Sequence, residues 1–145
     1  MSLLIDDQKF VALKFHYLEI PSVYVSKFKF IQTKEEFEKN KEDPNLKELN
    51  TGWKVLTWAD HNQIYNECLT YSTNENGITV TNLNFIKFRD MKLKLCLKTW
   101  DLVDESGRAL PLTPKAIDSL YPEVANELLN GFEKVTEIAG PELKN

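Results

Sequence analysis

The sequence is short of the residues from which most metal and phosphate sites are built. Its 145 residues include two cysteines, two histidines and five glycines. A structural zinc site needs about four ligands that converge on one point, and a phosphate-binding loop needs clustered glycines. Cys68, Cys96, His16 and His61 have no such spacing, and no Gly-x-Ser-x-Gly sequence occurs. We therefore expect no catalytic residue, no metal site and no cofactor.

Long apolar runs and a strong charge of one sign are also missing. No apolar run approaches the roughly 18 residues of a membrane-spanning helix, and the opening MSLLIDDQKF turns acidic too early for a secretory signal. The net charge of -4 argues against attraction to nucleic acid or to an anionic membrane. Cys68 and Cys96 lie in apolar helix-like stretches, so we expect reduced, buried thiols in a cytoplasm-like setting.

Apolar residues make up 42% of the chain and aromatic residues 11%, which is enough for one core. Residues 1–50 are interpreted as a strand-rich N-terminal segment that ends in a polar linker. FVALKFHYLEIPSVYVSKFKFI predicts two or three short strands, interrupted at Pro21 because proline cannot donate to a ladder. In the polar stretch, Thr33 and Glu36 form a capping-box pattern that predicts a short helix.

Residues 51–145 are interpreted as a mainly α-helical domain. Thr57 is typical of a helix N-cap, and Asp60 follows at the third helical position. The pair Asn76–Gly77 predicts a turn or hairpin. The stretch NFIKFRDMKLKLCLKTW then predicts one long amphipathic helix from about Asn84 to Trp100.

The last third of the sequence carries several stop and start signals. Gly107 in DESG favours a turn with positive φ. Thr113–Pro114 and Tyr121–Pro122 each predict the start of a helix, because proline suits the first helical position. Gly131 costs the second of these helices roughly 1 kcal/mol against alanine, or else marks a break or close packing. Gly140–Pro141 predicts its end.

The predicted fold class is therefore α+β: a small N-terminal β portion followed by a mainly helical C-terminal bundle. We expect about four helices in that bundle. The residues expected at its centre are Trp58, Phe88, Trp100, Leu128 and Phe132.

Five residues are candidates for contact with a partner: Trp53, Trp58, Arg89, Lys92 and Trp100. Tryptophan is enriched in interface hot spots, although a place in the core is the alternative for each of the three. Arg89 and Lys92 fall inside the apolar arc of the predicted long helix. Either their stems extend outward to solvent, or they meet acidic groups across an interface.

The chain from Trp53 onward resembles a known group of proteins. WKVLTWADHNQIYNEC is similar to the Leu-Thr-Trp and acidic-helix opening of small tail-assembly and baseplate-hub proteins of tailed bacteriophages. LKTWDL, DESGRALPLTP and LYPEVANEL then follow in the order and spacing of that group. The resemblance covers about residues 53–135, and the N-terminal third departs from it. It implies that Trp58, Trp100 and the corner Leu110–Thr113 are hallmarks of the fold.

The resemblance implies a nonenzymatic protein, chaperone-like or an incorporated hub subunit, in the virion or in the host cytoplasm during assembly. Its expected partners are other phage tail, hub or tape-measure proteins, with no nucleic acid and no membrane; self-association stays open. One alternative is a structural virion protein elsewhere, such as a connector or decoration subunit, whose exposed strands extend a neighbour's sheet. Another is a small enzyme or ligand binder, which a deep polar cavity around His61 would favour.

Overall fold

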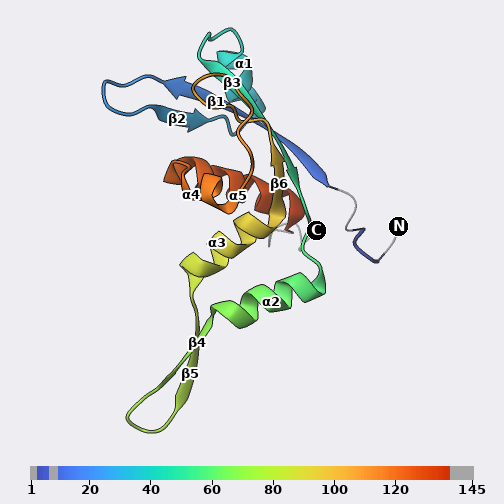
Figure 1. The fold of residues 1–145 in the computed structure, drawn as a ribbon, viewed down its shortest axis with the longest axis vertical. Helices are drawn as coiled ribbons and strands as arrows, with labels where there is room; N and C mark the ends of the chain where they lie inside the picture. Colours follow the sequence, from blue (N-terminus) through green and yellow to red (C-terminus); the bar gives the residue numbers. More distant parts are fainter. Residues whose placement is uncertain (1–2, 7–9, 138–145) are drawn as a thin grey trace.

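The computed structural model describes residues 3–6 and 10–137 and shows an α+β chain (Figure 1). Its strands are β1 (Val11–Ile20), β2 (Lys27–Phe30), β3 (Leu46–Trp53), β4 (Leu69–Thr73), β5 (Thr79–Leu83) and β6 (Leu97–Trp100). Its helices are α1 (Lys34–Asn40), α2 (Trp58–Cys68), α3 (Phe85–Cys96), α4 (Pro114–Asp118) and α5 (Pro122–Thr136). β2, β1, β3 and β6 form one antiparallel sheet in that order, and β4 and β5 form a separate hairpin.

The four-stranded sheet is built on the long pairing of β1 with β3, which runs from Val11 opposite Trp53 to Leu18 opposite Leu46. β1 ends directly before Pro21, as the sequence predicts. The last part of the predicted polar linker, from Leu46 on, is strand β3. Lys47 and Glu48 face solvent, while Leu49 and Trp53 point into the core.

The core lies between this sheet and α5. The Trp53 ring stacks on Phe132 with centroids 4.6 Å apart, and the Trp53 indole N–H donates to the Thr51 hydroxyl. A β-carbon at Gly131 would lie 2.4 Å from the Phe15 ring, so glycine at this position allows α5 to approach β1 closely. The buried cluster comprises Phe30, Leu49, Trp53, Leu93, Cys96, Leu97, Ile117, Val124, Leu128, Leu129 and Phe132. It therefore joins the N-terminal strands to the C-terminal helix.

Between β3 and β6 the chain makes one excursion through α2, the β4–β5 hairpin and α3. It leaves and re-enters the sheet at neighbouring points, because the Lys54 N–H donates to the Cys96 carbonyl over 2.7 Å. Thr57 and Asp60 form a capping box at the start of α2, and Asn84 caps α3. The hairpin turns at Gly77, whose φ is +77°, and extends away from the sheet at the end of the molecule opposite α1 (Figure 1).

The predicted helical bundle is wrong. After β6 the described chain contains two short helices, α4 and α5, and the earlier helices α2 and α3 alternate with strands. The predicted helix Asn84–Trp100 ends at Cys96, and Leu97–Trp100 is the edge strand β6, paired with β3. Leu97–Trp100 is extended and not helical because the extended backbone pairs with β3, whose hydrogen-bonding groups on that side would otherwise be unpaired. Gly52 also leaves room for Thr99, whose hydroxyl would lie 2.3 Å from a β-carbon there.

The core list is corrected in part as well. Leu128 and Phe132 are buried, as expected, whereas Trp58 is 79% exposed. Trp58 is the first residue of α2, which packs against α3 and lies away from α5 (Figure 1). Trp100 is half-buried, and its indole N–H donates to the Leu110 carbonyl over 2.7 Å.

The start and stop signals of the last third are mostly confirmed. Gly107 has a φ of +83°, and α4 and α5 begin at Pro114 and Pro122. Thr113 accepts a hydrogen bond from the Ala116 N–H, as an N-cap does. The predicted helix end at Gly140–Pro141 lies outside the described residues.

Candidate protein-contact surface

A row of aromatic rings runs across α2 and α3. We call Trp58, His61, Tyr65, Phe88 and Phe85, in this order, the aromatic row. Neighbouring ring centroids along it are 6.5, 4.5, 5.1 and 6.2 Å apart. On each helix the members are three or four residues apart, so helical geometry places them on one face. The row is therefore continuous across two helices and fixed by their packing.

Both ends of the aromatic row are open to solvent. Trp58 is 79% exposed and Phe85 is 64% exposed, and Ile86 beside Phe85 is 85% exposed. Scattered single apolar residues are normal on a protein surface, but contiguous large ones mark sites of contact with other molecules. Tryptophan at such a site is the residue that most often dominates binding energy. The row consequently has the properties of a protein-contact surface.

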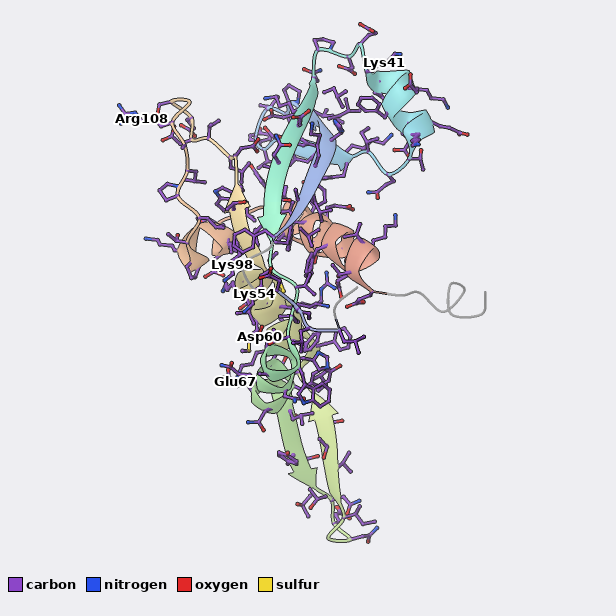
Figure 2. The ribbon with its side chains drawn as sticks, turned by 90° about the vertical axis from the view of Figure 1, so that its right-hand side faces the viewer. Lys41, Lys54, Asp60, Glu67, Lys98 and Arg108 are labelled. Carbon is purple, nitrogen blue, oxygen red and sulfur yellow. The ribbon has the colours of Figure 1, made fainter. Side chains whose placement is uncertain are left out.

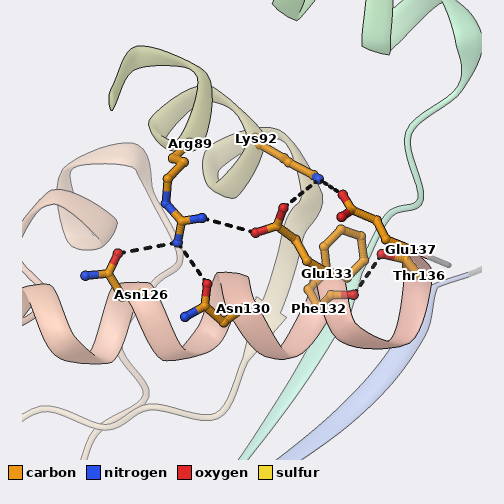
Figure 3. Close-up of polar contacts among 8 residues, drawn as sticks. All are labelled: Arg89, Lys92, Asn126, Asn130, Phe132, Glu133, Thr136 and Glu137. Carbon is orange, nitrogen blue, oxygen red and sulfur yellow. Dashed lines mark hydrogen bonds and ion pairs between the residues drawn. The ribbon is translucent and has the colours of Figure 1, made fainter. Parts of the chain in front are cut away.

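Beside the aromatic row, α3 is joined to α5 by an ion-pair cluster (Figure 3). The Arg89 Nη1 donates to Glu133 Oε1 over 3.2 Å, and the Lys92 Nζ donates to Glu133 Oε2 over 3.2 Å and to Glu137. Arg89 also donates to the side-chain oxygens of Asn126 and Asn130. The two basic residues therefore meet acidic groups of their own chain.

Lys92 is the central member of this cluster, with a side chain only 8% exposed. Burial opposes its charge, but the hydrogen bonds to Glu137 and Glu133 outweigh burial and raise the pKa of Lys92 above its ordinary value. Its ammonium also lies 5.9 Å from the centre of the Phe88 ring. Lys92 stays charged and lies beside Phe88, the member of the aromatic row between Tyr65 and Phe85.

The structure brings together only some of the predicted contact residues. Trp58 belongs to the aromatic row, and Arg89 and Lys92 lie next to it. Trp53 is fully buried against Phe132, and half-buried Trp100 holds the chain after β6 through its bond to Leu110. These two tryptophans stabilise the fold.

Sequence reasoning missed Phe85 and Ile86 as surface residues. Both belong to the stretch NFIKFRDMKLKLCLKTW, which was interpreted as one amphipathic helix, and Leu93 and Cys96 of the same stretch are buried. The signal in the sequence was their position in the first helical turn, directly after the cap residue Asn84. The first turn of a helix lies farthest from an element that packs against the last turns. Here α5 covers the last turns of α3 and leaves the first turn bare.

Two cavities lie elsewhere. The larger, about 860 Å³, opens between β1 and α5 and is lined partly by Gln32, Glu127 and Lys134. The smaller, about 150 Å³, is mainly apolar and lies between β2 and Tyr121. His61 lines neither of them, and its ring instead packs between Trp58 and Tyr65.

The two thiols are buried, as predicted from the sequence. Burial raises the pKa of Cys96 to about 12, so this thiol is protonated at neutral pH. Within residues 3–6 and 10–137, no three side chains of the histidine, cysteine or acidic type come together as metal ligands would. In the same part of the chain, no helix has the length and apolar character needed to cross a membrane.

Comparison with known proteins assigns the chain to no family: no family model, no curated protein and no solved structure matches it. The contacts described above are therefore the ground on which a function can be argued.

Proposed function

We propose that the chain is a nonenzymatic protein of bacteriophage tail or baseplate assembly that acts through protein–protein contacts. It serves either as a chaperone-like factor or as an incorporated hub subunit. Its partners are other tail, hub or tape-measure proteins, met in the virion or in the host cytoplasm during assembly. Neither nucleic acid nor membrane takes part in these contacts.

The observation that carries the contact function is the exposed aromatic row. Its rings are held in place by α2–α3 packing and by the Lys92 cluster, so binding costs little side-chain ordering. Rigid aromatic anchors at an exposed site are the usual centres of interface binding energy. Such a surface explains why a small acidic protein keeps Trp58 in water.

The phage assignment rests on the resemblance over about residues 53–135. Two of its motif pieces, LKTWDL and DESGRALPLTP, touch each other through the bond from Trp100 to Leu110. A third piece, LYPEVANEL, opens α5 and contributes Val124 and Leu128 to the core. These packing positions support the proposal, since the resemblance implies that Trp100 and the corner Leu110–Thr113 are hallmarks of the fold.

The test is capture of purified tail-tube, tape-measure and hub proteins from the same source by the immobilised full chain. We expect one of them to bind, and we expect Trp58→Ala to weaken that binding about tenfold or more, as loss of a hot-spot side chain does. Val103→Ala is the matched control, since Val103 is an exposed apolar residue outside the aromatic row. Binding of none of these proteins, or equal loss in both variants, would refute the proposal.

The second candidate is a structural virion protein at another position, such as a connector or decoration subunit. The observation that favours it is the exposed β1–β2 connection, where Val23 and Tyr24 are open to solvent beside the edge strand β2. An edge strand with apolar neighbours can add to another subunit's sheet. Mass spectrometry of purified particles separates the two, because a chaperone is absent from them and a structural subunit is present in fixed proportion.

A further inference from the structure

Among the residues that the structure describes, the β4–β5 hairpin is a two-stranded sheet without a third strand or a covering layer. Five residue pairs join its strands, from Leu69 opposite Leu83 to Thr73 opposite Thr79. It is not hydrogen-bonded to the four-stranded sheet, and Figure 1 shows it extending beyond α2 and α3. Isolated two-stranded hairpins are marginally stable in water. A third strand would therefore stabilise it.

The edges of this hairpin lack the devices that usually block strand addition. Natural edge strands carry charges, prolines or bulges that prevent another strand from pairing. Residues 69–83 include one charged residue, Glu75 in the turn, and no proline, although 28% of the whole chain is charged. The register between β4 and β5 is unbroken. Both edge strands are thus regular, and no charge, proline or bulge in them blocks pairing with another strand.

The hydrogen bonds at the two ends of the hairpin show which groups of β5 face outward. The Asn74 N–H donates to the Ile78 carbonyl, and the Asn84 N–H donates to the Cys68 carbonyl. In an antiparallel pair, residues alternate between facing the partner strand and facing away from it. The N–H and C=O groups of Thr79, Thr81 and Leu83 therefore point away from β4.

We propose that β5 pairs antiparallel with β5 of a second copy of this chain, around a two-fold axis at Thr81. This register sets Thr81 opposite Thr81 of the second copy and Thr79 opposite Leu83 of the second copy. All the outward-facing groups of β5 are then hydrogen-bonded, and two marginal hairpins become one four-stranded sheet. The proposal does not rest on the proposed function, because it requires no other protein.

The apolar residues at the two ends of β5 suit this arrangement. Ile78 at the tip is 57% exposed, and Phe85 and Ile86 lie at the base. In a two-fold antiparallel pair the tip of each hairpin reaches the base of the other. Ile78 of each copy then lies beside Phe85 and Ile86 of the other copy, and all of them lose contact with water.

Charge decides between the two edges. In the β5 pair, Glu75 at one tip approaches the first turn of α3 of the second copy. That turn contains Lys87, whose Nζ donates to the Glu67 carbonyl over 3.1 Å, and no acidic residue, and a helix N-terminus favours a negative charge. In the corresponding pair through β4, Glu75 would approach Glu67 at the C-terminal end of α2, where the helix dipole is negative (Figure 2). The β5 edge is therefore favoured and the β4 edge disfavoured.

The first test is disulfide formation in single-cysteine-addition variants of the full chain. Opposed residues of a hydrogen-bonded antiparallel pair lie about 5.5 Å apart at Cα, within reach of a disulfide. We expect Thr81→Cys to form a covalent dimer on mild oxidation, and Tyr71→Cys, at the equivalent place on β4, to stay monomeric. Native Cys68 and Cys96 are fully buried and do not interfere. Equal cross-linking of both variants, or cross-linking of Tyr71→Cys alone, would overturn the proposal.

The second test measures the molar mass of the unmodified chain by light scattering as concentration rises. We expect a dimer that Thr81→Pro abolishes and that Tyr71→Pro leaves intact, since each proline removes one outward-facing N–H and spares the β4–β5 bonds. Glu75→Lys and Lys87→Glu should each weaken the dimer, and the double exchange should restore it. A wild-type chain that stays monomeric, or a double exchange weaker than both single ones, contradicts the two-fold pair.

Discussion

Two tryptophans five positions apart lie in opposite surroundings, and they represent two regions of the molecule. Trp53 belongs to the packed region, where the sheet and α5 form two layers with the core between them. Trp58 belongs to the extension, which we define as α2, the β4–β5 hairpin and the first turns of α3. Among the described residues, no second layer packs against the surface that carries Trp58. Apolar surface is buried where another layer packs against it, and in α2 this holds for Ile64 and Cys68 and not for Trp58. The extension therefore leaves exposed the kind of apolar surface that the packed region buries in its core.

The strongest test of this difference is to remove each tryptophan. Trp53→Ala should lower the free energy of unfolding by about 3–5 kcal/mol, because it removes the ring stacked on Phe132 and leaves a cavity. Trp58→Ala should change it by less than about 0.5 kcal/mol, as exposed substitutions do. Urea denaturation followed by circular dichroism measures both. Similar losses in the two variants would show that the extension is packed after all.

The link between the two regions can be cut at Lys92. Lys92→Ala should cost about 2 kcal/mol, since it leaves Glu133 without one of its hydrogen-bond donors and removes a nearly buried stem. Lys98→Ala is the control, because Lys98 is exposed on β6 and should change stability little. The same denaturation experiment compares them. A neutral Lys92→Ala would mean that apolar contacts and the bonds of Arg89 hold α3 to α5 without Lys92.

Inside the packed region, Gly131→Ala tests how closely α5 approaches the sheet. Alanine favours a helix by about 1 kcal/mol over glycine, but here its β-carbon would meet the Phe15 ring at 2.4 Å. We expect a net loss of roughly 1–2 kcal/mol from overpacking. Adding Phe15→Leu should recover part of that loss, because the smaller side chain makes room. A stabilising Gly131→Ala would show that the contact is loose.

The smallest effect is expected at the start of the extension, where Asp60 closes the capping box of α2 and pairs with Lys54 (Figure 2). The hydrogen bond from Lys54 outweighs burial and, with those from Thr57, lowers the pKa of Asp60 below its ordinary value of 3.8. A lowered pKa gives stability that is present above that value and lost as the pH falls through the folded-state pKa. Asp60→Asn should therefore cost about 1 kcal/mol at pH 7.

The difference in the free energy of unfolding between wild type and Asp60→Asn should then decrease as the pH falls below about 4, where the wild-type carboxylate takes up its proton. Urea titrations of both proteins at several pH values measure it. A gap of the same size at neutral and acidic pH would show that the charge of Asp60 contributes nothing.

Local features of the fold were predictable from the sequence, and features that depend on distant residues were not. Thr33, Thr57 and Thr113 each cap a helix as expected, because a cap involves only the next three residues. Strand β6 was missed, since KLCLKTW suits a helix as well and its extended form depends on β3, more than 40 residues earlier. The bundle prediction failed for this reason.

The candidate contact surface shows the same difference between features that are local in sequence and features that depend on distant residues. Arg89 and Lys92 stood out because charges inside an apolar arc require partners. Which of the glutamates Glu123, Glu127, Glu133 and Glu137 they meet depends on how α3 crosses α5, and no sequence pattern fixes that crossing. Trp58 was a candidate on residue type alone. Its exposure follows from where α2 lies relative to α5, which is set by the whole excursion between β3 and β6.

The placement of the tryptophans also gives the molecule an optical consequence. Trp53 lies in a dry, stacked site, Trp58 is open to water and Trp100 is half-buried. We therefore expect a blue-shifted emission from Trp53, a red-shifted emission from Trp58 and an emission between them from Trp100. Any partner that covers the aromatic row will shift the emission of Trp58 and leave that of Trp53 unchanged. Binding at the aromatic row can therefore be followed by the emission of Trp58, with Trp53 as an internal reference and without an added dye.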